Sequence, residues 1–275
     1  MKILFAGVLC AGLALQSVVA CEYYMREQEQ LHARKIFSRA KTFPVASNGQ
    51  IPNVARNKIF ITIDDGPYGA ATPAVLDVLH RYGVKATFFV VGKQAETYPQ
   101  LVRRVYDEGH VIGSHTYEHG LDYSTPKDFL TSLLRTHRQI IPYQSTAEAL
   151  LFRAPGGVWN DWRTTIANNN ETMSEYVGAI YWNVGGGDPA NRDDADWKCW
   201  SKANKVAPTQ CAQSYLKQIR RNYSTRKSAS IVLMHDINIK SAQMLEIILN
   251  DLTNDRSVDW EFGLVQEIPA VRNLM

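Results

Sequence analysis

Short apolar runs alternate with helical stretches along the chain from about residue 57 onward. Seven runs are rich in β-branched or aromatic residues and predict strands, over Ile59–Ile63, Ala86–Val91, His110–Gly113, Leu150–Arg153, Val177–Val184, Ser230–Met234 and Trp260–Val265. Pro73, Pro99 and Pro208 stand between these runs, where helices are expected to begin. Alternation of this kind is typical of a mainly parallel sheet, and seven strands favour a single α/β barrel.

The first residues have the pattern of a secretory signal peptide. A lysine precedes an apolar run from Ile3 to Leu15, and small residues end the segment at Val18-Val19-Ala20. A buried helix or a retained membrane anchor is the alternative, but this run is short for a span of about 20 residues. We expect three parts, which are a signal peptide over residues 1–20, an N-terminal extension over residues 21–56 and one domain over residues 57–275.

The cysteines suggest export to the periplasm or cell envelope. Val18-Val19-Ala20-Cys21 resembles the bacterial lipobox, in which the new N-terminal cysteine carries a lipid. Cys199 and Cys211 are close enough to form a disulfide in an oxidising compartment, which leaves Cys21 as the odd thiol. We therefore expect a Cys199–Cys211 bridge, and for Cys21 either lipidation and membrane attachment or an unmodified thiol.

Composition and charge narrow the possible partners only slightly. The 275 residues are 45% hydrophobic and 21% charged, which is ordinary for a globular domain with a substantial core. The formal net charge is only +3, and the basic residues are scattered along the chain. No nucleic-acid partner is expected, because such proteins usually carry a concentrated basic patch.

Polar residues follow several of the predicted strands, where barrels place catalytic groups. Asp64 and Asp65 follow the first strand, although a solvated Asp-Gly turn is the alternative. His115 and His119 follow a later strand, and one helical turn would direct both imidazoles the same way. Two histidines and a carboxylate leave a zinc ion with an open position, so we predict a catalytic metal site with one aspartate as ligand and the other as base.

Two further strand ends carry candidate catalytic groups. Arg153 precedes a Pro-Gly-Gly turn whose backbone NH groups could face an oxyanion. His235 follows a buried strand and could act as a general acid, because its ordinary pKa is near neutrality. Taken singly, Arg153 could form a surface salt bridge and His235 could be a core residue. Four polar strand ends together favour a catalytic site.

These segments resemble the motifs of the polysaccharide deacetylase family, carbohydrate esterase family four, whose shared region is the NodB homology domain. The resemblance rests on Thr62–Pro67, Ser114–His119, Arg153–Gly157 and Leu233–His235. It implies a distorted (β/α)7-type barrel with a bound divalent metal ion, and we expect zinc. It also implies that Asp64 is the base, Arg153 positions it, Asp65, His115 and His119 bind the metal, His235 is the acid and the Gly156 NH group faces the oxyanion.

The fourth motif of the family departs from its usual Asp-Trp ending. Asp188 is followed by a proline, whereas Asp196 and Trp197 fit the ending after an insertion. We expect Asp196 to fill this place and Trp197 to contact substrate, with Asp188 as the alternative. Trp159, Trp162, Tyr181, Trp182 and Trp200 are further candidates for stacking on sugar rings, and about two of the six aromatic residues are expected to do so.

The resemblance implies an enzyme that removes acetyl groups from N-acetylglucosamine units of peptidoglycan or a chitin-type polysaccharide and releases acetate. A dedicated acid suits an amide better than an ester, because a departing amine needs a proton more than an alcohol does. An acetyl-xylan-type esterase is one alternative. A non-catalytic glycan-binding lipoprotein is the other, because the fourth motif is irregular.

Overall fold

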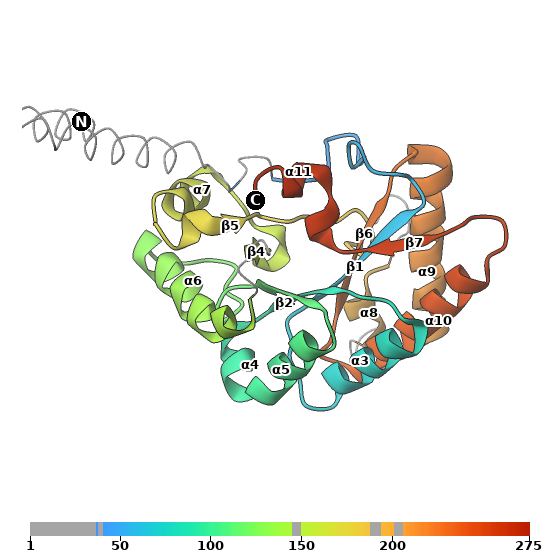
Figure 1. Ribbon diagram of the computed structural model, residues 1–275, viewed down its shortest axis with the longest axis horizontal. Helices are drawn as coiled ribbons and strands as arrows, with labels where there is room; N and C mark the ends of the chain where they lie inside the picture. Colours follow the sequence, from blue (N-terminus) through green and yellow to red (C-terminus); the bar gives the residue numbers. More distant parts are fainter. Residues whose placement is uncertain (1–36, 38–40, 145–149, 188–193, 201–205) are drawn as a thin grey trace, which may run out of the picture. The chain divides into compact units, whose positions relative to one another are not determined.

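The computed structural model describes residue 37 and residues 41–144, 150–187, 194–200 and 206–275. Strands and helices alternate along these residues, and the helices surround the strands (Figure 1). The strands are β1 (Lys58–Asp64), β2 (Thr87–Val90), β3 (Val111–Ser114), β4 (Leu150–Phe152), β5 (Tyr176–Val177), β6 (Ser230–His235) and β7 (Glu261–Gly263). The main helices are α3 (Ala71–Tyr82), α4 (Gly92–Thr97), α5 (Pro99–Asp107), α6 (Pro126–Ile140), α7 (Asp161–Asn168), α8 (Asp196–Trp200), α9 (Pro208–Arg221), α10 (Ile239–Asn254) and α11 (Pro269–Arg272). The predicted α/β class is confirmed.

The sheet is built around β1, and every ladder among the described residues is parallel. The strand order is β5-β4-β3-β2-β1-β6, and β7 also pairs with β1. Residues 62–64 of β1 pair with β2, whereas residues 58–60 pair with β7. Because all of these strands run in the same direction, their carboxyl ends meet at one edge of the sheet.

The predicted strand over Val177–Val184 is wrong for most of its length. Ladder pairing covers only Tyr176–Val177, and the chain then runs irregularly between β4 and β6. The Ile180 NH group donates to the last residue of β4 at 2.8 Å, and the Val184 NH group donates to β6 at 3.2 Å. The apolar run therefore reflects burial of this segment between two strands, which residue type alone cannot separate from strand pairing.

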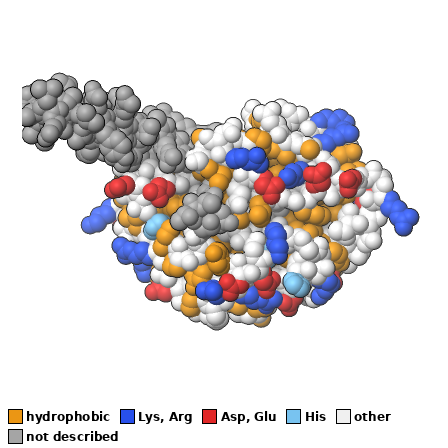
Figure 2. All heavy atoms as spheres, viewed as in Figure 1, with side chains coloured by type: hydrophobic (Ala, Val, Ile, Leu, Met, Phe, Trp, Pro, Cys, Tyr) orange, Lys and Arg blue, Asp and Glu red, His pale blue; other side chains and the backbone are white. Residues whose placement is uncertain are grey.

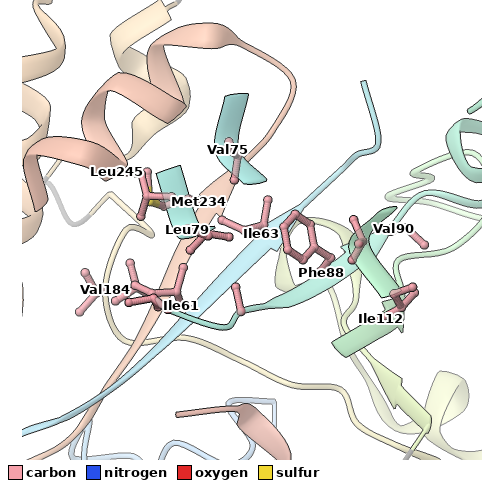
Figure 3. Packing of buried hydrophobic residues seen from close by; sticks show 14 of the residues in the cluster. Ile61, Ile63, Val75, Leu79, Phe88, Val90, Ile112, Val184, Met234 and Leu245 are labelled. Carbon is pink, nitrogen blue, oxygen red and sulfur yellow. The ribbon is translucent and has the colours of Figure 1, made fainter. Parts of the chain in front are cut away.

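Successive side chains of β1 point to opposite faces of the sheet and contribute to two separate buried clusters. Ile61 and Ile63 point toward the helices and pack with Val75 and Leu79 of α3 and with Leu245 of α10 (Figure 3). The intervening residues Phe60, Thr62 and Asp64 lie on the opposite face, where Phe60 joins a second buried cluster with the β2 residue Phe89 and the β6 residue Ile231. This second face carries the polar groups described below.

Residues before β1 also contribute to the core. Phe37, Val45 and Ile51 are all buried, and Phe37 stacks on Trp159. No helix in the described ranges is long and apolar enough to cross a membrane. On the face drawn in Figure 2, acidic and basic side chains are interspersed, and neither charge predominates.

Candidate active site

The parallel register brings the polar strand ends together. Asp64 pairs directly with His235 on β6, and its other neighbour in the sheet is Phe89 on β2. Ser114, which precedes His115, pairs with Phe152, which precedes Arg153. The four strand ends singled out in the sequence therefore lie at one edge of the sheet.

Asp64 and Asp65 are adjacent in the chain but have different backbone conformations. Asp64 is the last residue of β1, and its buried side chain lies on the same face as Thr62. Asp65 has φ +78°, a left-handed conformation that takes its side chain out of the strand alternation. The two neighbouring carboxylates can consequently face the same site while making different contacts.

His115 and His119 converge, but they do not lie on the helical turn that was predicted. The segment after β3 is an irregular loop in which Thr116 and His119 have φ values of +63° and +56°. Backbone hydrogen bonds from Gly92 and Lys93 of α4 hold this loop in place. The imidazole centroids are 5.1 Å apart, so two left-handed residues bring the rings together instead of helical periodicity.

Asp65, His115 and His119 form a set of donors that fits a divalent metal ion. One ligand atom from each residue lies within 4.8 Å of the other two. Oδ1 of Asp65 is 3.4 Å from Nε2 of His115 and 3.1 Å from Nε2 of His119. That oxygen is buried and has no hydrogen-bond partner among the described residues. A buried oxygen without a donor, facing two imidazole nitrogens, suits a cation with nitrogen and oxygen ligands.

Neighbouring groups prepare these side chains for metal binding. Nδ1 of His115 lies 2.8 Å from the backbone carbonyl of Arg153, and since a carbonyl can only accept, Nδ1 donates to it and Nε2 is the nitrogen available to a metal ion. Burial acts to raise the pKa of Asp65, but the His115 and His119 side chains and the charge of His235 hold this pKa well below its ordinary value. Asp65 is therefore ionised, as a ligand must be.

Arg153 is fully buried beneath Asp64. Its Nη1 donates to Oδ1 of Asp64 at 2.8 Å and to the Thr62 hydroxyl at 2.6 Å, while Nε donates to the Ile180 carbonyl at 3.0 Å. Oδ2 of Asp64 points the other way, 3.7 Å from Nε2 of His115. The guanidinium thus occupies one oxygen of the carboxylate and leaves the other facing the metal-ligand set.

His235 and Asp196 form a second, independent pair. Nδ1 of His235 donates to Oδ1 of Asp196 at 2.8 Å, and the His235 backbone NH donates to Oδ2 at 2.7 Å. Burial acts to lower the pKa of His235, but Asp196, with Asp65 and Asp64 nearby, raises it to about 10. Nε2 lies 3.9 Å from Oδ2 of Asp65, so this nitrogen is close to the metal-ligand set.

The next residue, Asp236, was not assigned a role from the sequence. It is fully buried, which raises its pKa to about 7, and it accepts a hydrogen bond from the Thr72 hydroxyl at 2.5 Å. A Cβ atom at Gly66 would collide with this carboxylate. Gly66 is therefore required by close packing as well as by the turn, which is a reason that only the tertiary contact reveals.

The remaining predicted residues differ in their surroundings. Gly156 follows β4 with φ +58°, and a side chain there would approach Leu121 to 3.0 Å. Trp197 lies on α8 and is 47% exposed, whereas Trp159 is buried in the core. The Trp200 ring packs edge-on against His235, with centroids 5.9 Å apart.

The predicted Cys199–Cys211 disulfide is present and joins α8 to α9. Cys21 and Asp188 lie outside the described residues, as does the whole of the predicted signal peptide. Among the described residues, Asp196 is the acid that accepts the hydrogen bond from Nδ1 of His235.

Comparison with known proteins agrees with this geometry. Residues 52–173 match the polysaccharide deacetylase family. A chitooligosaccharide deacetylase of Sinorhizobium fredii is 33% identical over 180 residues, which cover 65% of this chain and 71% of the relative. The chain belongs to the polysaccharide deacetylase family.

Two further relatives act on a cell-wall polymer, according to their names. The peptidoglycan-N-acetylglucosamine deacetylase PgdA of Listeria monocytogenes is 32% identical over 223 residues, which are 80% of this chain but only 40% of that protein. A solved peptidoglycan N-acetylglucosamine deacetylase superposes with a TM-score of 0.58 at 26% identity, covering 77% of this chain and 87% of the other. The chain thus spans less than half the length of the Listeria relative.

Proposed function

We propose that this protein is a metal-dependent hydrolase that removes acetyl groups from N-acetylglucosamine units of peptidoglycan or a chitin-type polysaccharide and releases acetate. One observation carries the proposal. Two ion pairs, Asp64–Arg153 and His235–Asp196, adjoin the metal-ligand atoms of Asp65, His115 and His119: Oδ2 of Asp64 is 3.7 Å from Nε2 of His115, and Nε2 of His235 is 3.9 Å from Oδ2 of Asp65. Hydrolysis of an amide requires a base and an acid within reach of the reacting groups, and these two pairs can supply them.

Asp64 is suited to accept a proton from the attacking water. Arg153 holds one carboxylate oxygen and fixes the side chain, so the second oxygen is available at a defined position. Asp64 is buried, so its proton transfer takes place away from bulk solvent. We assign Asp64 as the general base and Arg153 as the residue that positions it.

His235 is suited to protonate the departing amine. Its Nδ1–H is held by Asp196, so Nε2 is the nitrogen that can present a proton to the site. An amine cannot leave as an anion at neutral pH, so amide hydrolysis depends strongly on such an acid. We assign His235 as the general acid.

The bound metal, which we propose to be zinc, would polarise the acetyl carbonyl and activate water when present. Two imidazoles and one carboxylate are the protein ligands of several catalytic zinc sites and leave further positions open. Gly156 follows β4 at the same edge of the sheet, and we assign its NH group to the oxyanion. Exposed Trp197 is assigned to a sugar ring.

The proposed location is the periplasm or cell envelope. Its support is the signal-like pattern over residues 1–20, the Cys199–Cys211 disulfide and the cell-wall substrates in the names of the relatives. Within this proposal Cys21 carries a lipid after cleavage. Mass spectrometry of the mature N-terminus tests this part separately.

The activity is tested with purified mature protein, added zinc, and either chitohexaose or peptidoglycan fragments as substrate. The expected result is release of acetate together with new free amines, and at least about 100-fold slower release of both with Asp64→Asn. Acetylated xylan is the parallel substrate, and acetate from xylan alone would replace the proposal by an esterase. Glycan binding without acetate, across several divalent metals, would replace it by a non-catalytic binding protein.

A further inference from the structure

Helix α9 presents four side chains to the segment that carries Asp196. They are Cys211, Ser214, Tyr215 and Gln218, which are spaced as one face of a helix. Each of the four makes a covalent bond or hydrogen bond to a residue on either side of Asp196 or to Asp196 itself. No part of this helix lies among the strand-end motifs, so its contribution is not visible from them.

Two of these residues hold the backbone that leads to α8. The Asp194 NH group donates to the Ser214 hydroxyl at 2.9 Å, and the Gln218 amide donates to the Asp194 carbonyl at 3.1 Å. The same Gln218 accepts a hydrogen bond from the Gly185 NH at 2.8 Å. Cys211 adds the covalent link to α8 described above.

Tyr215 contacts Asp196 itself. Its hydroxyl is fully buried and accepts a hydrogen bond from the Asp196 NH at 2.9 Å. The same hydroxyl donates to the Leu233 carbonyl at 2.9 Å, two residues before His235 on β6. One hydroxyl therefore joins the first residue of α8 to the strand that carries the acid.

The Asp196 carboxylate has little freedom once its backbone is fixed. One oxygen accepts from Nδ1 of His235, and the other accepts from the His235 NH and, at 3.3 Å, from the Ser241 hydroxyl. The direction of the imidazole thus depends on where Asp196 is held. We infer that Tyr215 is a positioning residue for the reaction, acting through Asp196 to aim Nε2 of His235 at the leaving amine. This inference rests on the proposed function.

Loss of the hydroxyl has a specific chemical consequence. In Tyr215→Phe the Asp196 NH and the Leu233 carbonyl lose a buried partner, so the start of α8 is released from β6. A poorly aimed acid slows departure of an amine, but 4-nitrophenolate leaves without a proton. The two leaving groups therefore separate a positioning role from general damage to the site.

The experiment compares acetate release from chitohexaose with hydrolysis of 4-nitrophenyl acetate, using zinc-loaded protein. For Tyr215→Phe we expect kcat on chitohexaose to fall about 10- to 100-fold, a part of the roughly 10²- to 10⁴-fold that a positioned acid contributes, with KM little changed. Turnover of 4-nitrophenyl acetate and the zinc content should stay at the wild-type level. Asp196→Asn should give the same pattern to a greater degree.

Tyr176→Phe is the matched control. Tyr176 is also buried, but its hydroxyl contacts Nδ1 of His137, at 3.0 Å, and no residue of the site. The Tyr176→Phe substitution should leave the rates of both reactions unchanged. Wild-type kcat on chitohexaose in Tyr215→Phe would overturn the inference, and so would equal loss of both reactions in a folded protein.

Failure of the proposed function can be distinguished from failure of this inference. If the wild-type protein releases no acetate from any glycan, the proposed function fails. The effect of Tyr215 on the position of His235 is then tested by NMR. The proton on Nδ1 of His235 is hydrogen-bonded to Asp196, so its resonance should lie downfield in the wild-type protein. This resonance should shift in Tyr215→Phe. An unchanged resonance would overturn the positioning role without any activity measurement.

Discussion

Asp64 and Asp65 show how one peptide bond separates two chemical roles. Arg153, which also donates to Thr62, binds the buried Asp64, whereas Asp65 has a left-handed conformation and lies close to His115 and His119. A guanidinium beside a buried carboxylate fixes its position and favours its ionised form, which suits a base. A carboxylate that faces two imidazole nitrogens can share a metal ion with them, which suits a ligand. The two residues should therefore respond differently to the same substitution.

We predict that Asp64→Asn retains the metal and loses at least about 100-fold in acetate release, since an amide cannot accept the proton. Zinc content by atomic absorption and kcat on chitohexaose measure the two effects. Asp251→Asn, an exposed acid paired with Arg220, is the control and should keep both. Wild-type turnover in Asp64→Asn would remove Asp64 from the role of base.

His110 is a buried histidine just before β3, at the opposite end of that strand from His115, and it links folding to pH. Its Nδ1 accepts a hydrogen bond from the Ala86 NH at 3.1 Å, which requires the unprotonated nitrogen. Burial, with lesser effects from neighbouring charges, lowers its pKa to about 4. The unfolded chain, with its ordinary pKa near 6.5, binds the proton first as the pH falls.

This stabilising contribution is complete above about pH 6.5 and is lost as the pH falls toward about 4. We predict that the wild-type free energy of unfolding drops over this window by up to about 3 kcal/mol on account of His110. Urea unfolding near pH 7 and near pH 4.5 measures the drop. In His110→Asn, which keeps an acceptor but cannot titrate, the drop should be smaller, and an equal drop would contradict the assignment.

At the scale of elements, strand register and helix α9 together assemble the acid side of the site. The β1–β6 register sets Asp64 beside His235, and α9 fixes α8 through side-chain bonds and the disulfide. Of the four contacts from α9, only the disulfide could be predicted from residue type and spacing. A hydrogen bond from a tyrosine to a distant backbone NH leaves no periodic signal in the sequence.

We predict that Cys199→Ser with Cys211→Ser lowers the free energy of unfolding by about 3 kcal/mol, because the bridge limits the unfolded chain over a separation of 12 residues. Urea unfolding of the oxidised proteins measures the change. Dithiothreitol should lower the stability of the wild-type protein to that of the double variant and leave the variant unaffected. If the reductant affects both proteins equally, the bridge is not the cause.

At the scale of the whole molecule, the proposed metal ion would be held by residues that are distant in the sequence and meet only in the folded chain. Asp65 follows β1 and both histidines follow β3, so an ion held by all three binds only the folded chain. A ligand that binds only the native state raises its stability by mass action. Metal binding is therefore measurable without any substrate.

We predict that zinc at about 100 times its dissociation constant raises the midpoint of thermal unfolding by about 5–10 °C, from a stabilisation of about 2.7 kcal/mol. Differential scanning calorimetry with zinc and with a chelator measures this shift. His119→Ala, which removes a half-exposed ligand, should unfold at the same temperature with and without zinc. A full shift in that variant would place the ion elsewhere.

Most of the strands, their polar carboxyl ends and the Cys199–Cys211 pair could be predicted from the sequence, because burial periodicity and residue type act locally. The irregular path between β4 and β6, the left-handed residues Thr116 and His119, and the role of Tyr215 could not. These features depend on what packs against a segment, and only the folded chain brings those partners together. The sequence alone determines which groups can do the chemistry, and the tertiary structure decides where each is aimed.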